Sequence, residues 1–151
     1  MNANLKCDVY NACQDNLADK IMLLSNSLSE LQKGVENDAK SSAGDKHETA
    51  MAMMQIEHAQ LSKQLNEVMI QKQMLARINP AIYTSVGTSG SLIKTNNGIF
   101  FLALALGKIK VNDEIFFVLS PQSPLGNKLM RTIAGDSFTI NNTTYVVENV
   151  I

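Results

Sequence analysis

Apolar residues in the first half of the chain recur every three or four positions, in two separate stretches. The first stretch runs from Tyr10 to Val35, and the second runs from Met51 to Leu75. Because an α-helix turns once about every 3.6 residues, this repeat places its members on one narrow face of a helix. Each stretch therefore predicts a long helix with a single apolar stripe. A stripe this narrow cannot form a globular core, but it can pair with a second stripe.

A polar stretch over residues 36–45 separates the two predicted helices. Since two helices with a short polar connection form a hairpin, residues 1–78 are predicted to be an antiparallel coiled-coil hairpin with its tip near 44–48. At ~1.5 Å per residue, roughly 30 residues per helix predict a rod of about 45–50 Å. His58 and Lys72 interrupt the second stripe. We expect His58 to pack edge-on and the Lys72 ammonium to reach water.

Residues 79–151 have a different pattern, with short apolar runs between turn-forming residues. All three prolines lie at or after Pro80, which predicts a domain boundary between residues 78 and 79. The run at 99–106 is apolar on both faces and is expected in the centre of a sheet. The predicted strands are 90–95, 99–106, 114–119, 137–140 and 143–150. Pairs of turn-forming residues separate them: Asn97-Gly98, Asn112-Asp113 and Asn141-Asn142.

One short helix is predicted over residues 123–130. Ser123 has the side chain of a helix N-cap, and Pro124 suits the first helical position because it needs no backbone N–H there. The predicted class is therefore α+β, with a helical hairpin followed by a compact β-rich domain that holds one short helix.

Composition and charge narrow the possible functions. The chain has 151 residues, of which 45% are hydrophobic and 18% are charged, as expected for a folded soluble protein. A free-standing nucleic-acid binder usually has a basic excess, and the net charge of −1 gives no reason to expect independent DNA binding. No apolar run is long enough to span a bilayer, and the N-terminus does not resemble a secretory signal. Cys7 and Cys13 make no disulfide or metal pattern, so we expect a cytoplasmic protein.

The segment Gly44-Asp45-Lys46-His47-Glu48 is the strongest candidate for chemistry. The local interpretation is a capping box, in which Asp45 caps the second helix and Glu48 reaches back. The functional interpretation is that two carboxylates at the end of a long rod enter another macromolecule. There they would complete the coordination of a hard cation such as Mg²⁺. No phosphate loop or zinc spacing is present in the chain, and a thin rod offers no dry pocket that would activate a cysteine.

These residues resemble a known family along essentially the whole chain, the bacterial Gre transcript-cleavage factors. The tip motif of that family is G-D-x-S-E-N-A, and the matching segment here is Gly44-Asp45-Lys46-His47-Glu48-Thr49-Ala50. The second signature is S-P-[IM]-x-x-x-L, followed by G-D. It corresponds to Ser123-Pro124-Leu125-Gly126-Asn127-Lys128-Leu129 and then Gly135-Asp136. Gly90-Ser91-Leu92-Ile93 resembles the G-S-x-V that opens the first strand of the family's C-terminal domain.

The resemblance implies an N-terminal antiparallel coiled coil, a C-terminal FKBP-like β domain over 79–151 and an accessory role in transcription. Gre factors dock at the rim of the secondary channel of RNA polymerase and insert the coiled coil. Asp45 and Glu48 would then help to hold a second Mg²⁺, shared with the polymerase, while the polymerase's own active site cuts the backtracked RNA 3′ end. The isolated protein would bind no metal and would not itself be an enzyme. Ser123 and Pro124 would lie in the loop facing the polymerase, with helix capping as the local alternative.

Departures from the family motif leave other functions open. His47 and Thr49 replace the family's Ser and Asn, and Met51 and Ala52 replace its usual Glu and Tyr. One alternative is a non-catalytic regulator that occupies the secondary channel. A second alternative is an FKBP-like proline isomerase or chaperone, although such sites use aromatic-lined pockets and the β domain has few aromatic residues.

Overall fold

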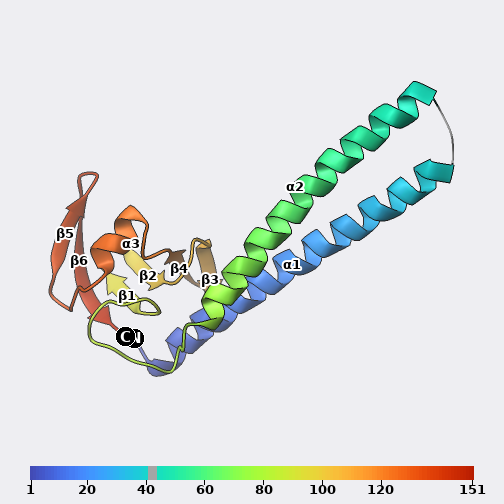
Figure 1. Cartoon of the computed structure of the whole chain (residues 1–151). Coiled ribbons are helices and arrows are strands. Elements are labelled where there is room, and N and C mark those ends of the chain that lie inside the picture. Colours follow the sequence, from blue (N-terminus) through green and yellow to red (C-terminus); the bar gives the residue numbers. More distant parts are fainter. Residues whose placement is uncertain (41–43) are drawn as a thin grey trace. The chain divides into compact units, whose positions relative to one another are not determined.

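The structure, a computed structural model, describes residues 1–40 and 44–151, and at 3, 38–40 and 44–47 it describes the backbone alone. Two long helices come first, α1 (Ala3–Lys40) and α2 (Gly44–Ala76). A sheet of six strands and one short helix follow them (Figure 1). The predicted α+β class and the order of its parts are therefore confirmed.

The contacts between residues in space divide the chain into two compact units. The sheet unit contains Met1–Asp15 and Gln73–Ile151, and the helix unit contains Asn16–Lys72. The start of α1 and the end of α2 thus belong to the same unit as the sheet. The domain division between residues 78 and 79 stays a prediction.

Within the helix unit, α1 and α2 run in opposite directions (Figure 1). The apolar residues of the predicted stripes are buried or half-buried from Leu17 to Val35 and from Met51 to Val68. The helices meet near the far end of this unit, where a Cβ built on Gly34 would lie 3.8 Å from Met54 Cε. Apolar residues off the stripes stay exposed: Met22, Leu23, Met53 and Ile56.

Two details of the helices differ from the prediction. The connection is shorter than 36–45, because α1 continues to Lys40 and α2 begins at Gly44. Glu and Lys are strong helix formers, and no proline stops the helix in this segment. His58 does not pack into the stripe; its side chain is exposed, and its Nδ1 lies 3.5 Å from Ser62 Oγ one turn later. Among the described residues, no helix has both the length and the apolar character needed to cross a membrane.

The sheet has the strand order β3-β4-β2-β1-β6-β5. Neighbouring strands are antiparallel, except that β2 and β4 are parallel. As predicted, β2 lies inside the sheet, between β4 and β1. The strands are β1 (Leu92–Thr95), β2 (Gly98–Leu102), β3 (Gly107–Val111), β4 (Glu114–Leu119), β5 (Ser137–Ile140) and β6 (Thr143–Val150).

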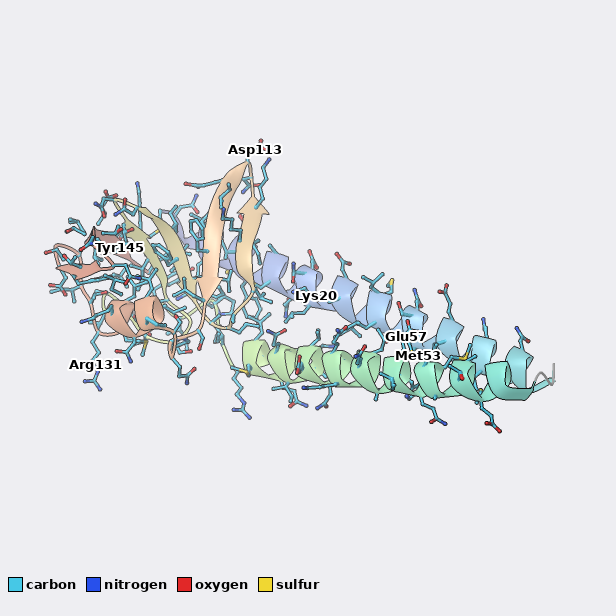
Figure 2. The ribbon with its side chains drawn as sticks, turned by 90° about the horizontal axis from the view of Figure 1, so that it is seen from above. Lys20, Met53, Glu57, Asp113, Arg131 and Tyr145 are labelled. Atoms are coloured by element: carbon cyan, nitrogen blue, oxygen red, sulfur yellow. The ribbon has the colours of Figure 1, made fainter. Side chains whose placement is uncertain are left out.

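The edge strand β3 was not predicted. The apolar run at 99–106 indicated a single strand, but β2 ends at Leu102 and the chain bends before β3 begins at Gly107. The turn from β3 to β4 does match its prediction, and Figure 2 shows Asp113 at this turn. Asn112 and Asp113 have φ of 51° and 65°, a left-handed conformation that Asn and Asp tolerate better than most residues.

The short helix α3 (Pro124–Leu129) covers one face of the sheet. Aromatic residues extend the apolar layer there. The Phe100 ring centroid lies 5.5 Å from that of Phe117 and 6.1 Å from that of Tyr145. The buried cluster on this face consists of Ile93, Phe100, Leu102, Leu129, Val147 and Val150.

The opposite face of the sheet is equally buried. Leu92 pairs with Phe101, and Phe101 pairs with Val118 in β4. None of these three residues is more than 1% exposed. The helix ends in the same unit also contribute buried apolar residues, including Val9 of α1 and Leu75 of α2. We infer that these helix ends cover the second face.

Phe101→Ala should lower the free energy of unfolding by about 3–5 kcal/mol, because it leaves a cavity at a fully buried position in the centre of the sheet. Urea denaturation followed by circular dichroism would measure the loss. The matched control is Ile115→Ala in β4, whose side chain is 51% exposed and which should cost no more than about 0.5 kcal/mol. Equal losses at the two positions would contradict the burial of the second face.

Candidate functional site

The predicted acidic tip lies at the start of α2. The side chains of Asp45 and His47 lie outside the described residues. The helix begins at Gly44, one residue before the predicted cap at Asp45. Glu48 is described; it is the fifth residue of α2, and its side chain is exposed.

An exposed carboxylate can bind a cation only with further ligands. Among the described residues, no group of three or more His, Cys, Asp or Glu side chains is placed to hold a metal ion. Glu48 therefore has no ready-made set of ligands around it in the part of the chain that the structure describes. Any metal chemistry at this end of the helices would need ligands beyond that part of the chain.

Ser123 is the N-cap of α3, as predicted. Its Oγ accepts a hydrogen bond from the Gly126 backbone N–H at 3.0 Å and donates one to the Ser120 carbonyl oxygen at 2.7 Å. Pro124 occupies the start of the helix, and it is exposed. The local role of both residues is therefore established, while their contact with a partner stays a prediction.

The loop before α3 leaves no room for a side chain at Gly126. A Cβ there would overlap the Ser120 carbonyl oxygen and would lie 2.8 Å from Ser123 Oγ. The glycine thus allows the tight approach on which the Ser123 cap depends. The exposed ring of Pro124 is held on a well-defined turn.

Lys6 was not singled out from the sequence, although it is one of the most buried polar residues. Its side chain comes from the first turns of α1 and is 2% exposed. Its Nζ donates a hydrogen bond to the Ile82 carbonyl oxygen at 2.6 Å and lies 5.5 Å from the centroid of the Tyr83 ring. The sequence could have indicated its burial, because Lys6 lies four residues before Tyr10 and is therefore on the same face of α1 as the apolar stripe.

The environment of Lys6 disfavours its charge. Burial lowers the pKa of the Lys6 ammonium below its usual value, and this outweighs the opposite effect of the nearby Cys7. Among the described residues, no carboxylate forms an ion pair with Lys6. The cation is therefore held by one backbone carbonyl and one aromatic ring.

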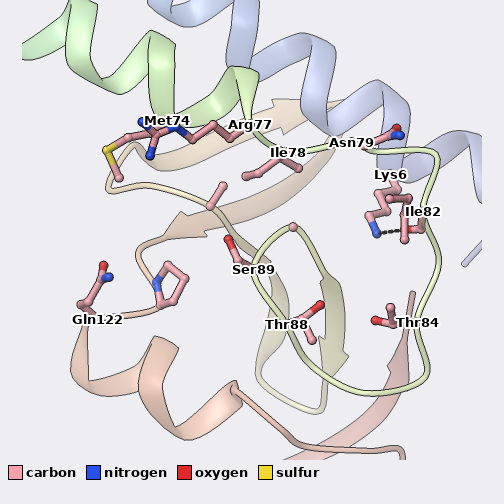
Figure 3. A pocket seen from close by; sticks show the side chains of 13 residues that line it. Lys6, Met74, Arg77, Ile78, Asn79, Ile82, Thr84, Thr88, Ser89 and Gln122 are labelled. Atoms are coloured by element: carbon pink, nitrogen blue, oxygen red, sulfur yellow. Dashed lines mark hydrogen bonds between the residues drawn. The ribbon is translucent and has the colours of Figure 1, made fainter.

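A cavity of about 390 Å³ lies beside Lys6, wholly within the sheet unit. We call it the Lys6 cavity. Figure 3 shows its walls, with Met74 and Arg77 at the end of α2, Ser89 in the segment before β1 and Gln122 before α3. A volume of this size is within the range of small-molecule sites, about 300–1,000 Å³.

The two cysteines are both free. Cys13 is fully buried, and burial raises the pKa of its thiol to about 12. The thiol therefore stays protonated at neutral pH and is a poor nucleophile. Cys7 Sγ lies 4.0 Å from the Pro80 carbonyl oxygen. The burial of Cys13 and the backbone contact of Cys7 are typical of cysteines that contribute to packing.

Comparison of the chain with protein-family models, curated proteins and solved structures gave no match. The function must therefore be argued from the residues and their geometry.

Ser123→Ala should lower the free energy of unfolding by about 1 kcal/mol, because the Gly126 N–H loses its hydrogen-bond acceptor. Chemical denaturation of the full chain would measure the change. Ser123→Thr retains the hydroxyl and should recover most of the loss. An equal loss in Ser123→Thr and Ser123→Ala would argue against capping as the cause.

Wild-type protein should gain stability relative to Lys6→Met as the pH rises towards 10.5, the ordinary value for lysine. The folded state has the lower pKa, so between the two values the unfolded state binds more protons and stability rises with pH. Urea midpoints across this range would measure the difference. Lys63→Met is the control, since this exposed side chain stays in water in both states. A stability difference that falls with pH would contradict the desolvation of Lys6.

Proposed function

We propose that this protein is a Gre-like transcription elongation factor, which binds RNA polymerase and assists cleavage of backtracked RNA in the secondary channel. The observation that carries the proposal is the position of the Gly44-Asp45 and Glu48 motif at the junction of two long antiparallel helices. At ~1.5 Å per residue, the 33 residues of α2 extend over about 50 Å, which is enough to carry an acidic end deep into a partner.

The chemistry of the tip fits shared metal binding. Carboxylate oxygens are the ligands that Mg²⁺ prefers, and the exposed Glu48 is accessible to an ion held by another molecule. In this proposal Asp45 and Glu48 supply two oxygen ligands, and the polymerase and water supply the others. A second Mg²⁺ would there make a water molecule a better nucleophile towards the RNA phosphate. The two carboxylates position that ion at the RNA 3′ end.

The C-terminal domain would provide the affinity for the polymerase. We propose that it is FKBP-like and that the N-terminal helices form a coiled coil. The mostly antiparallel sheet with α3 on one face and the half-buried stripes of α1 and α2 support these assignments. Pro124 is exposed on the turn that Ser123 caps, which suits a contact with the polymerase rim. The place of action would be the cytoplasm, where bacterial polymerase works.

A second candidate function follows from the departures in the tip motif. His47, Thr49, Met51 and Ala52 replace residues of the family pattern close to the two acids. A factor with such a tip would occupy the channel and regulate the polymerase without stimulating cleavage. This candidate predicts polymerase binding that does not depend on Asp45 or Glu48.

The double variant Asp45→Asn, Glu48→Gln should abolish RNA cleavage in halted elongation complexes and leave binding to core RNA polymerase intact. Both substitutions remove a charged oxygen ligand while they keep the size of the side chain. Cleavage is measured from the length of labelled RNA, and binding is measured by co-elution with the polymerase. Asp19→Asn, Glu57→Gln is the matched control, because it removes one carboxylate charge from an exposed position of each long helix.

The outcomes of these two assays distinguish between the two candidate functions. The catalytic proposal is supported if the wild type and the control stimulate RNA cleavage by the polymerase and the tip variant does not. Binding by all three proteins without cleavage supports the non-catalytic regulator. If the wild type does not bind core polymerase, both candidates are wrong. A peptide-based prolyl isomerisation assay then tests the FKBP-like alternative.

A further inference from the structure

Helix α2 carries a second row of residues with coiled-coil spacing, in addition to the stripe that begins at Met51. Each member lies two residues after a member of that stripe, and two residues turn an α-helix by about 200°. The second row therefore points away from α1, which the first stripe approaches where Met54 lies near Gly34. We call the second row the outer stripe, and it consists of Met53, Ile56, Gln60, Lys63, Glu67 and Ile70.

The outer stripe is exposed along its whole length. Met53, Ile56 and Ile70 are 64%, 56% and 48% exposed, and the three polar members between them are exposed as well. Single exposed apolar residues are common on protein surfaces and indicate no partner. Apolar residues at both ends of a row with three- and four-residue steps are different, because this is the spacing with which helices pair. The outer stripe therefore suits contact with another helix.

The order of residue types along the outer stripe is nearly symmetric. Ile56 and Ile70 stand towards its two ends, and polar residues fill its centre. Two copies of α2 can run antiparallel about a two-fold axis level with Gln64. At ~1.5 Å per residue, Ile56 of one copy then lies about 3 Å along the helix axis from Ile70 of the second copy. This offset allows the apolar side chains of the two copies to interdigitate.

The charges at the centre of the outer stripe select this antiparallel arrangement. The same alignment brings Lys63 of one copy equally close to Glu67 of the second copy, and the two-fold axis makes this pair twice. A parallel pair in register would instead place like charges beside each other, which is repulsive. Among the described residues, neither Lys63 nor Glu67 forms an ion pair within its own chain. Both side chains are therefore available to a second copy.

We propose that the outer stripe is a homodimer interface, in which α2 of one copy packs antiparallel against α2 of a second copy. The occupant is a second copy because the stripe is complementary to itself, in both its apolar ends and its central charges. The interface lies within the helix unit, and it does not depend on the proposed function. In dilute protein the dimer dissociates, and the outer stripe stays in water.

Sedimentation velocity of the full chain over a range of concentrations tests the interface. Wild-type protein should pass from monomer to dimer as its concentration rises. Ile56→Asp should raise the dissociation constant of the dimer about tenfold or more, because it places an unpaired carboxylate among apolar side chains. Leu23→Asp is the matched control, since Leu23 is 68% exposed on α1 and lies outside the outer stripe. Far-UV circular dichroism shows that both variants are folded.

Exchange of the central charges tests their complementarity independently. Lys63→Glu leaves carboxylates alone at the centre and Glu67→Lys leaves cations alone, so each variant by itself should dimerise more weakly than the wild type. An equimolar mixture of the two variants should recover the dimer, because opposite charges then face each other again.

Three results overturn the proposal. The first is a wild-type protein that stays monomeric up to about 1 mM. The second is an equal effect of Ile56→Asp and Leu23→Asp on the dimer. The third is a mixture of Lys63→Glu and Glu67→Lys that dimerises no better than either variant alone.

Discussion

The two-sided burial of the sheet is the constraint on which the rest of the sheet unit depends. Phe100 and Phe101 are neighbours in β2 and point to opposite faces, yet neither is more than 4% exposed. One face is covered by α3. The other requires a second cover, and the ends of α1 and α2 are the elements of the unit that remain for it. The hydrogen bond from Tyr10 Oη to the Leu75 carbonyl oxygen, at 3.1 Å, joins these two helix ends.

This arrangement explains why the two candidate sites differ in character. In the helix unit, most of the described stripe residues are half-buried, and Glu48 is exposed. In the sheet unit, by contrast, the helix ends and the segment before β1 enclose a cavity next to the buried Lys6. A cavity of this kind can select a small molecule with its own residues.

The sequence predicts local structure well where single residues decide it. Asn141-Asn142 adopts the left-handed turn between β5 and β6, with φ of 49° and 65°, because few other residues tolerate that conformation. Ser123 caps α3 because its hydroxyl oxygen replaces a missing backbone acceptor. Both features depend only on neighbours in the chain, and a short pattern is enough to find them.

The features that were missed depend on contacts between distant residues. The apolar run at 99–106 does not show that the chain leaves the sheet after Leu102, since a bend that buries Leu104 and a strand share the same composition. The Lys6 cavity is a stronger case, because its walls come from segments that are far apart in the sequence: the start of α1, the end of α2 and the loops before β1 and α3.

The net charge of −1 argues against independent nucleic-acid binding, but it says nothing about how charge is arranged locally. Physiological salt screens exposed charges over about 8 Å, so the local arrangement of charge matters more than its sum over the chain. An average near zero is therefore compatible with local clusters of either sign. The Lys6 cavity illustrates this, because Lys6 and Arg77 both line it while none of its described lining residues is acidic.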